Sequence, residues 1–279
     1  MSAVPDVLLS ERRGRVLVLT FNRPDRLNAW TGELERRYYE ALVQAENDPG
    51  VGAVVITGAG RGFCAGADMD DLEQAGKAGD AGGQGAARSF PLAFRKPLIA
   101  AVNGAAIGVG LVQALYCDVR FASSSAKLST VFARRGLIAE YGSSWLLTQI
   151  VGRSVALDLL LSGRIITGQE ARELGVVHQA LETADVLDAA IAYASDIAEN
   201  CSPTSAAVIK AQVNSDAHSD IETAILQADI ELKASFGRPD VNEGVASFVE
   251  RRTPQFPALD SSAAERIDPL EFLRTNVVR

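Results

Sequence analysis

The stretch between Lys96 and Asp118 constrains the fold most, because it runs for 21 positions without a charged residue. A run of that length is long enough to form a membrane-spanning helix. Its composition argues against a span, since Asn103 and Gln113 are polar and the three glycines Gly104, Gly108 and Gly110 cluster in its middle. We instead predict a buried strand over residues 98–102, a turn at Asn103-Gly104, and a helix that begins among the glycines.

A helix that starts in small residues directly after a strand presents unpaired backbone amides at its first turn. Such amides attract anions or a polarised carbonyl oxygen. The segment over residues 54–69 has the same organisation, with a β-branched run, several glycines and then Ala67-Asp68-Met69. Two amides that converge on one oxygen would form an oxyanion hole, in which each donor contributes ~3–4 kcal/mol to the transition state.

Composition limits the classes of function. The chain has 279 residues, 47% of them hydrophobic, which suits one large domain or a domain with an appendage. A net charge of -8 argues against a nucleic-acid partner. Charged residues precede any long apolar run at the N-terminus, so no secretory signal is predicted. Three scattered cysteines favour reduced thiols in the cytoplasm.

Other kinds of site are disfavoured. With only His178 and His218, neither a metal centre nor a Ser-His-Asp triad is expected. Gly108-Val109-Gly110 lacks the third glycine of a dinucleotide fingerprint, and no glycine is followed by Lys-Ser or Lys-Thr as in a P-loop. Cys64 and Cys117 are expected to fill the core rather than to act as nucleophiles. We therefore predict no metal, no nucleic acid and no membrane partner.

The chain divides near Cys201 into an α/β core over residues 1–200 and a helical region with a C-terminal tail over residues 201–279. The first part alternates predicted strands, at 7–9, 15–21, 53–57, 98–102 and 118–122, with helices near 34–45 and after 67. Residues 74–87 are rich in Gly and Ala and are predicted as a mobile loop. Capping patterns at Thr167–Glu170 and Ser202-Pro203 open later helices, followed by others over 220–236 and 240–251. Helices without a core of their own need a partner surface, which predicts oligomerisation.

Several motifs occur in an order that resembles the crotonase superfamily, also called the enoyl-CoA hydratase/isomerase family, over about residues 5–255. The motifs are Phe21-Asn22-Arg23-Pro24 with Leu27-Asn28-Ala29, Arg61-Gly62-Phe63-Cys64-Ala65-Gly66-Ala67-Asp68-Met69, Lys96-Pro97-Leu98-Ile99-Ala100-Ala101-Val102-Asn103-Gly104 with Cys117-Asp118, and Leu161-Ser162-Gly163-Arg164 with Ala171-Leu174-Gly175-Val176-Val177. Each motif alone is weak, and their order makes the resemblance specific.

The resemblance implies a spiral of ββα units and a C-terminal helical region that forms trimers, often paired into hexamers. It implies an acyl-CoA thioester substrate and no cofactor beyond the coenzyme A that the substrate carries. The thioester oxygen would be held by the backbone amides of Ala67 and Val109, although the family usually has Gly at the second position. The residues implied to contact coenzyme A are Arg26, Leu27, Ala29, Ala65, Asp68 and Met69. Of these, Asp68 also has a structural interpretation, as an acid at the start of a helix.

The resemblance also locates a departure from the family. Hydratases use two glutamates, and the corresponding positions here are Val112 and Phe132, neither of which can transfer a proton. Glu140 instead resembles the single catalytic Glu of Δ3,Δ2-enoyl-CoA isomerases, in a loop where ring-isomerising relatives carry Asp. An apolar pocket that includes Val112, Phe132 and Trp145 would raise its pKa. Three hypotheses stay open: an isomerase that uses Glu140, a hydratase with this single carboxylate, and a catalytically weak acyl-CoA-binding protein.

Overall fold

Two β-sheets form the centre of the computed structural model, which describes residues 6–78 and 88–259. The larger sheet has the order β1-β2-β3-β5-β7-β10, and the smaller has the order β4-β6-β8-β9. The larger sheet contains β1 (Leu8–Arg13), β2 (Val16–Phe21), β3 (Ala53–Gly58), β5 (Leu98–Val102), β7 (Val119–Ser123) and β10 (Gln179–Leu181). The smaller contains β4 (Gly62–Cys64), β6 (Ala105–Ile107), β8 (Lys127–Ser129) and β9 (Ile166–Thr167).

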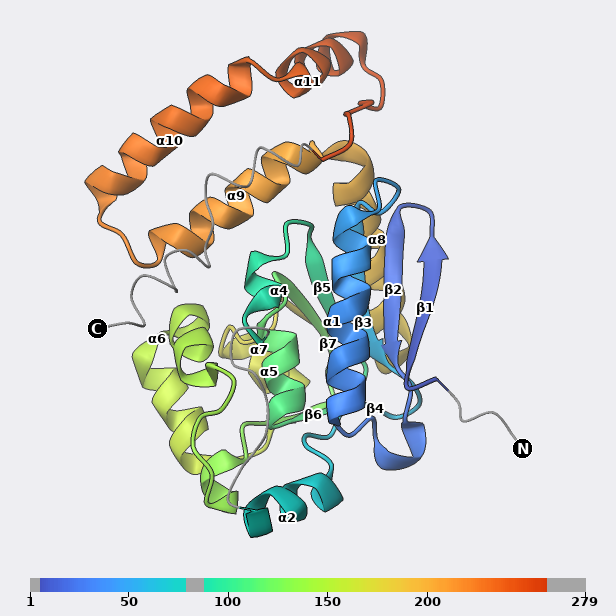
Figure 1. The fold of residues 1–279 in the computed structure, drawn as a ribbon, viewed down its shortest axis with the longest axis vertical. Coiled ribbons are helices and arrows are strands. Elements are labelled where there is room, and N and C mark those ends of the chain that lie inside the picture. Colours follow the sequence, from blue (N-terminus) through green and yellow to red (C-terminus); the bar gives the residue numbers. More distant parts are fainter. Residues whose placement is uncertain (1–5, 79–87, 260–279) are drawn as a thin grey trace.

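The chain repeats one pattern three times: a strand of the larger sheet, a strand of the smaller sheet, and then a helix (Figure 1). The repeats are β3-β4 with α2 (Met69–Ala78), β5-β6 with α5 (Val109–Leu115), and β7-β8 with η2 (Phe132–Arg135) and α6 (Ser143–Ser162). This confirms the predicted α/β spiral of ββα units. Because β3, β5 and β7 are parallel, and β4, β6 and β8 likewise, the turns before these helices meet at one edge.

The uncharged stretch does not form a span, because it folds as β5, β6 and α5, each far too short to cross a bilayer. In the described part of the chain, α6 is the one helix that is long and apolar enough to do so by length and composition. Its backbone leaves the helical conformation at Gly152, where φ is 72° and ψ is 165°. It is therefore two shorter helical segments rather than one continuous rod.

Helices cover both faces of the larger sheet. On one face, α1 (Gly32–Asn47) buries four side chains at helical spacing, Leu34, Tyr38, Leu42 and Ala45. On the other, α8 (Val186–Asn200) packs the small side chains of Ala190, Ala194 and Ala198 against the strands. The remaining short helices of the core are η1 (Pro24–Arg26), α4 (Phe90–Ala93), α7 (Gly168–Glu173) and η3 (Thr183–Asp185).

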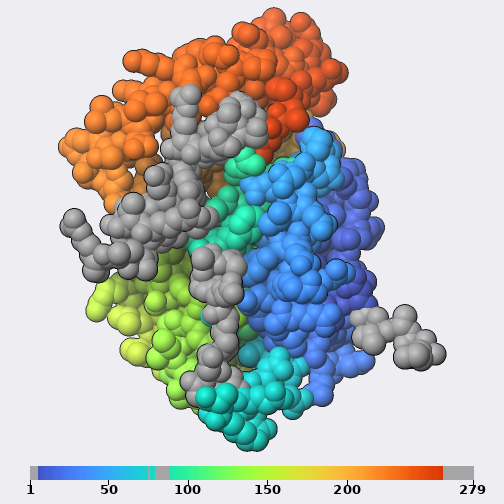
Figure 2. Space-filling view, in the orientation of Figure 1, coloured from blue at the N-terminus to red at the C-terminus, as the bar shows by residue number. Residues whose placement is uncertain are grey.

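Three further helices follow Cys201: α9 (Pro203–Asp216), α10 (Ile221–Phe236) and α11 (Pro239–Glu250). As predicted, Ser202 caps α9 by accepting a hydrogen bond from the Ser205 amide at 3.0 Å. The three helices form an arm at one end of the molecule, with α10 lying alongside α9 (Figures 1 and 2). Within the described residues, the arm's own buried apolar cluster consists only of Val208 and Ala211. This arm therefore has little core of its own.

The structure differs from the sequence-based expectation at residues 74–78, which were predicted to belong to a loop. They continue α2, whose last turns carry an (i, i+4) ion pair between Glu73 and Lys77. The rest of the predicted loop, residues 79–87, lies outside the described residues, as does the tail from residue 260. Residues 253–259 contain no helix or strand.

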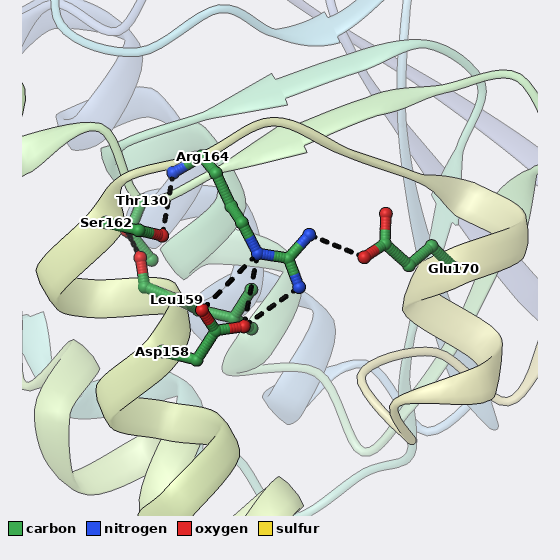
Figure 3. A network of polar contacts seen from close by, with 6 residues as sticks. All are labelled: Thr130, Asp158, Leu159, Ser162, Arg164 and Glu170. Atoms are coloured by element: carbon green, nitrogen blue, oxygen red, sulfur yellow. Dashed lines mark hydrogen bonds and ion pairs between the residues drawn. The ribbon is translucent and has the colours of Figure 1, made fainter.

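The motif Leu161–Arg164 proves to be a junction between three elements (Figure 3). The Arg164 guanidinium binds Asp158 of α6 and Glu170 of α7. The Thr130 hydroxyl donates to the Leu159 carbonyl at 2.7 Å, and the same carbonyl accepts from the Gly163 amide at 3.1 Å at the end of α6. These contacts attach the β8–η2 connection to α6, and that connection carries Phe132.

Candidate active site

The amides of Ala67 and Val109 lie at the same edge of the smaller sheet. Ala67 comes three residues after β4, Val109 comes two residues after β6, and these strands pair in parallel. Val109 is the first residue of α5, so its N–H has no acceptor within the helix. Across residues 6–78 and 88–259, neither N–H donates to a protein acceptor.

Two glycines let these turns approach closely. A Cβ on Gly110 would lie 2.1 Å from the Cys64 carbonyl oxygen, and a Cβ on Gly66 would lie 3.0 Å from the Ile107 carbonyl oxygen. Because both neighbours are backbone atoms, no side-chain rearrangement could make room. Gly110 in particular places the start of α5 directly against the end of β4. The structure thus brings the two predicted amide donors onto adjoining turns.

The predicted coenzyme A wall is formed by two chain segments that run side by side. The Ala65 amide donates to the Leu27 carbonyl at 3.0 Å, the Trp30 amide to Gly66 at 2.7 Å, and the Asp68 amide to Trp30 at 2.9 Å. The buried Asn28 side chain donates to the Ala59 and Gly62 carbonyls. These bonds hold Leu27 and Asn28 in the left-handed region, with φ of 50° and 58°.

The side chains of this wall fall into two groups. Arg26 and Met69 are largely exposed at the rim, and Arg26 lies 3.6 Å from the Asp70 carboxylate. Asp68 is buried, pairs with Arg23 at 2.8 Å and accepts from the Asp70 amide, so its pKa lies below the usual range, chiefly because of the hydrogen bond from Arg23. The Asp68 carboxylate is therefore committed to protein contacts, whereas Arg26 is accessible to a phosphate.

Val112 and Phe132 are both buried in the main apolar cluster. The edge of the Phe132 ring is 3.7 Å from the position that a Cβ of Gly108 would take. Val131, just before it, has a φ of 51°, which is strained for a β-branched residue. The Val131 amide donates to the Ser129 hydroxyl at 3.1 Å. A strained backbone conformation of this kind persists only where surrounding contacts maintain it. The conformation of Val131 in turn sets the direction in which the chain enters Phe132.

The loop that carries Glu140 is anchored on both sides. The hydroxyl of Tyr116, the residue that caps the C-terminus of α5, donates to the Tyr141 carbonyl at 2.6 Å, and the Tyr141 hydroxyl donates to Glu35 of α1 at 2.8 Å. Tyr116 lies seven residues after Val109, which is two helical turns and the same face of α5. The loop that carries Glu140 is therefore attached to the C-terminal end of α5 and, through Tyr141, to α1.

The Glu140 carboxylate is available for proton transfer. It is half-buried, and no hydrogen bond to it is found in the described part of the chain. Burial raises the pKa of Glu140 above 4.5, and the positive charge of Arg88 partly opposes this. A half-buried carboxylate with a raised pKa suits a general base that must also return a proton.

Sequence reasoning missed the residues that position this loop. Glu35 was assigned only to the first turn of a helix, but it also accepts from Trp30 Nε1 at 2.9 Å. Arg88 lies 3.9 Å from the Glu35 carboxylate and stacks its guanidinium 4.1 Å above the Tyr141 ring. Glu35 and Tyr141 are 106 residues apart, so no local pattern could have linked them.

Trp145 lies in a different setting from Val112 and Phe132. Its ring stacks on His218 at 5.3 Å and lines a cavity of about 630 Å³ between α6, α9 and the core. Its predicted part in the acyl pocket stays a prediction. Cys64 and Cys117 are buried, and burial raises the pKa of Cys64 to about 12, as expected of core thiols. No group of three His, Cys, Asp or Glu residues that could hold a metal ion occurs among the described residues.

Comparisons with known proteins identify the family. Residues 11–258 match the family described as enoyl-CoA hydratase/isomerase. The chain belongs to the enoyl-CoA hydratase/isomerase family. It is therefore an acyl-CoA enzyme of the hydratase/isomerase type, in the crotonase superfamily.

Several relatives within the enoyl-CoA hydratase/isomerase family cover most of the chain. The 1,2-epoxyphenylacetyl-CoA isomerase of Escherichia coli is 36% identical over 90% of this chain and 98% of its own. The short-chain-enoyl-CoA hydratase of Clostridium acetobutylicum is 31% identical over 88% of this chain and 95% of its own. The crystal structure of an enoyl-CoA hydratase from Polaromonas superposes with a TM-score of 0.83 at 32% identity. The match covers 89% of this chain and 99% of the Polaromonas chain.

Proposed function

We propose that this chain shifts a double bond in an enoyl-CoA thioester from the 3,4 to the 2,3 position, with Glu140 as its acid and base. One observation carries the proposal. Glu140 is a half-buried carboxylate with a raised pKa, on a loop that Tyr116 attaches to the end of α5, while the two positions where a hydratase would keep glutamates are Val112 and Phe132. A single carboxylate is sufficient for a 1,3-proton shift.

The reaction follows from the groups present. The thioester oxygen accepts hydrogen bonds from the Ala67 and Val109 amides, which stabilise the negative charge that develops when C2 loses a proton. Glu140 accepts that proton, the electron pair passes through the thioester enolate to form the 2,3 double bond, and Glu140 returns the proton to C4. Atoms and charge balance without a cofactor, so coenzyme A enters only as part of the substrate.

A hydratase that uses one carboxylate is the second candidate, because relatives such as the Clostridium enzyme are named hydratases. Addition of water to a 2-enoyl-CoA requires a group that orients the water and one that protonates C2. Because Val112 and Phe132 stand where a hydratase would keep its two glutamates, Glu140 alone would have to orient the water and protonate C2. This makes hydration the less favoured reaction here.

We also propose that the chain acts as a cytoplasmic homo-oligomer, a trimer or hexamer, with Arg26 binding a phosphate of coenzyme A. The three free cysteines are consistent with a reducing compartment. The support for an oligomer is the arm of α9, α10 and α11, which exposes many large apolar side chains and has little core of its own. No nucleic-acid or membrane partner is part of the proposal.

The experiment compares native protein with Glu140→Gln on 3-hexenoyl-CoA and 2-hexenoyl-CoA. We expect native protein to isomerise the first ester, and Glu140→Gln to lose roughly 100-fold or more of kcat. Binding of hexanoyl-CoA, which cannot react, should stay unchanged. Glu33→Gln, an exposed change in the first turn of α1, is the matched control and should have native activity.

Three results would contradict the isomerase assignment. Turnover within a few-fold of native in Glu140→Gln would exclude Glu140 as the base. Faster hydration of 2-hexenoyl-CoA than isomerisation of 3-hexenoyl-CoA would favour the hydratase. Absence of any turnover together with micromolar binding of hexanoyl-CoA would identify an acyl-CoA-binding protein.

A further inference from the structure

Gln113 is a polar side chain that the proposed mechanism does not use, although it lies on the helix that begins at Val109. It is fully buried on α5. Neither its amide nitrogen nor its amide oxygen has a hydrogen-bond partner among the residues that the structure describes. Buried polar atoms are almost always paired, because an unpaired one has lost its hydration without compensation. An amide at this position therefore calls for a polar partner.

A second unpaired group faces it from α1. The Tyr39 hydroxyl oxygen is also buried and without a hydrogen-bond partner in the described part of the chain. Burial raises the pKa of Tyr39 far above 10, and a hydrogen-bonding contact with the Gln113 side chain opposes that shift. The two groups are close, but no hydrogen bond of normal geometry joins them. Together they offer an N–H donor, a carbonyl acceptor and a hydroxyl that can serve as either.

The position of this pair relates it to the site. Gln113 is four residues after Val109, so it lies on the same face of α5, roughly 6 Å further along the helix axis. One turn beyond it, Tyr116 holds the Glu140 loop. Along α5, Gln113 therefore lies between the Val109 amide and Tyr116, which binds the loop of the proposed base.

The surrounding charges favour a neutral ligand over an anionic one. The carboxylates of Glu35 and Glu140 both act on this region, since Glu35 raises the pKa of Tyr39 and Glu140 raises that of Tyr141. The cation among them, Arg88, lies 3.9 Å from Glu35 and stacks on the Tyr141 ring. A carboxylate on the acyl chain would meet these negative charges, whereas a hydroxyl or a carbonyl would not.

We propose that Gln113 and Tyr39 recognise a neutral oxygen, a hydroxyl or a carbonyl, carried by the acyl group a few carbons beyond the thioester. The substrate class is then an oxygenated enoyl-CoA rather than a plain fatty enoyl-CoA. This inference rests on the proposed function, because it assumes that the acyl group of a CoA thioester occupies the site between Ala67, Val109 and Glu140.

The test measures calorimetric binding of four unreactive esters: hexanoyl-CoA, 5-oxohexanoyl-CoA, 6-hydroxyhexanoyl-CoA and adipoyl-CoA. Native protein should bind at least one of the two neutral oxygenated esters on the order of tenfold more tightly than hexanoyl-CoA. Gln113→Leu and Tyr39→Phe should each remove most of that preference while binding hexanoyl-CoA as native protein does. Gln169→Leu, an exposed change on α7, should keep the preference.

Folding does not confound this comparison, because Gln113→Leu removes two unpaired buried polar atoms and should melt at or above the native temperature. Equal binding of hexanoyl-CoA and both oxygenated esters, or a preference that survives both variants, would overturn the inference while leaving the isomerase intact. Preference for adipoyl-CoA would overturn the neutral assignment. Failure to bind any of the four esters would instead count against the proposed function itself.

Discussion

Glu140 owes its position to side chains that are distant in the sequence. Tyr116 holds the loop from α5, and Glu35 holds it through Tyr141 from α1. Tyr141 itself has a φ of 52°, a conformation that a non-glycine residue keeps only when its contacts maintain it. The acid that we propose for this site is thus positioned by two hydrogen bonds, neither of which involves its own carboxylate.

The pH dependence of turnover should report the raised pKa of Glu140. The base must be ionised to accept a proton, so kcat/KM for 3-hexenoyl-CoA should fall as pH decreases through the pKa of the free enzyme. Because burial raises that pKa, the midpoint of the fall should lie above 4.5. A pH profile of initial rates between pH 4 and 8 measures it. A midpoint at or below 4.5 would show that burial does not control this carboxylate.

At the scale of elements, the contact between α5 and β4 can be tested through Gly110. An added Cβ would lie 2.1 Å from the Cys64 carbonyl oxygen, so Gly110→Ala must move the start of α5 and the Val109 amide. We expect a loss of about 1–3 kcal/mol in the free energy of unfolding and a fall in kcat, although alanine favours helices over glycine. Urea denaturation and turnover measure both effects.

The matched control is Gly32→Ala at the start of α1, where no atom lies within 4 Å of the added Cβ. It should leave both quantities near native values. If Gly110→Ala kept native stability and turnover, the turn after β4 and the start of α5 could move apart without loss of stability or activity.

Elements with local signals were predictable from the sequence. The strand Leu98–Val102 was predicted with its observed bounds, because an apolar run ends there at a turn dipeptide. Thr167 caps α7 through the Glu170 amide at 3.1 Å, as the capping pattern predicted. Such features depend on neighbours within a few residues, which is the range over which sequence patterns are informative.

Features that depend on distant contacts were not predictable. The glycine-rich composition after Gln74 predicted a loop, yet α2 continues to Ala78. Gln113 was interpreted only as a polar residue that argues against a membrane span. That it is buried beside Tyr39 depends on how α5 and α1 pack, and no spacing within either helix encodes that packing.

At the scale of the whole molecule, the arm leaves apolar surface uncovered. Ile225, Leu226 and Ile230 of α10 are each more than half exposed, and so are Phe248 and Val249 of α11. Exposed apolar patches of this extent mark association surfaces in soluble proteins. An assembly of identical chains would bury them, as we proposed.

Light scattering after size-exclusion chromatography should give native protein the mass of three or six chains of 29.5 kDa. The double variant Leu226→Asp, Ile230→Asp should shift to smaller species, because it places charge in an apolar contact. Gln227→Asp, which adds charge on the same helix without removing an apolar side chain, is the control. Native protein that elutes as a monomer at tens of micromolar would contradict the oligomer.

If backbone amides at Ala67 and Val109 hold the thioester oxygen, as we propose, this choice has an evolutionary consequence. A side-chain catalyst can be lost through many single mutations, but an amide donor disappears only when proline replaces its residue. Mutations around these turns can therefore exchange acids, bases and pocket walls while the thioester contact is inherited unchanged. The apolar residues Val112 and Phe132, with an acid elsewhere at Glu140, illustrate how a new reaction can arise on such a scaffold without rebuilding the part that holds the substrate's carbonyl.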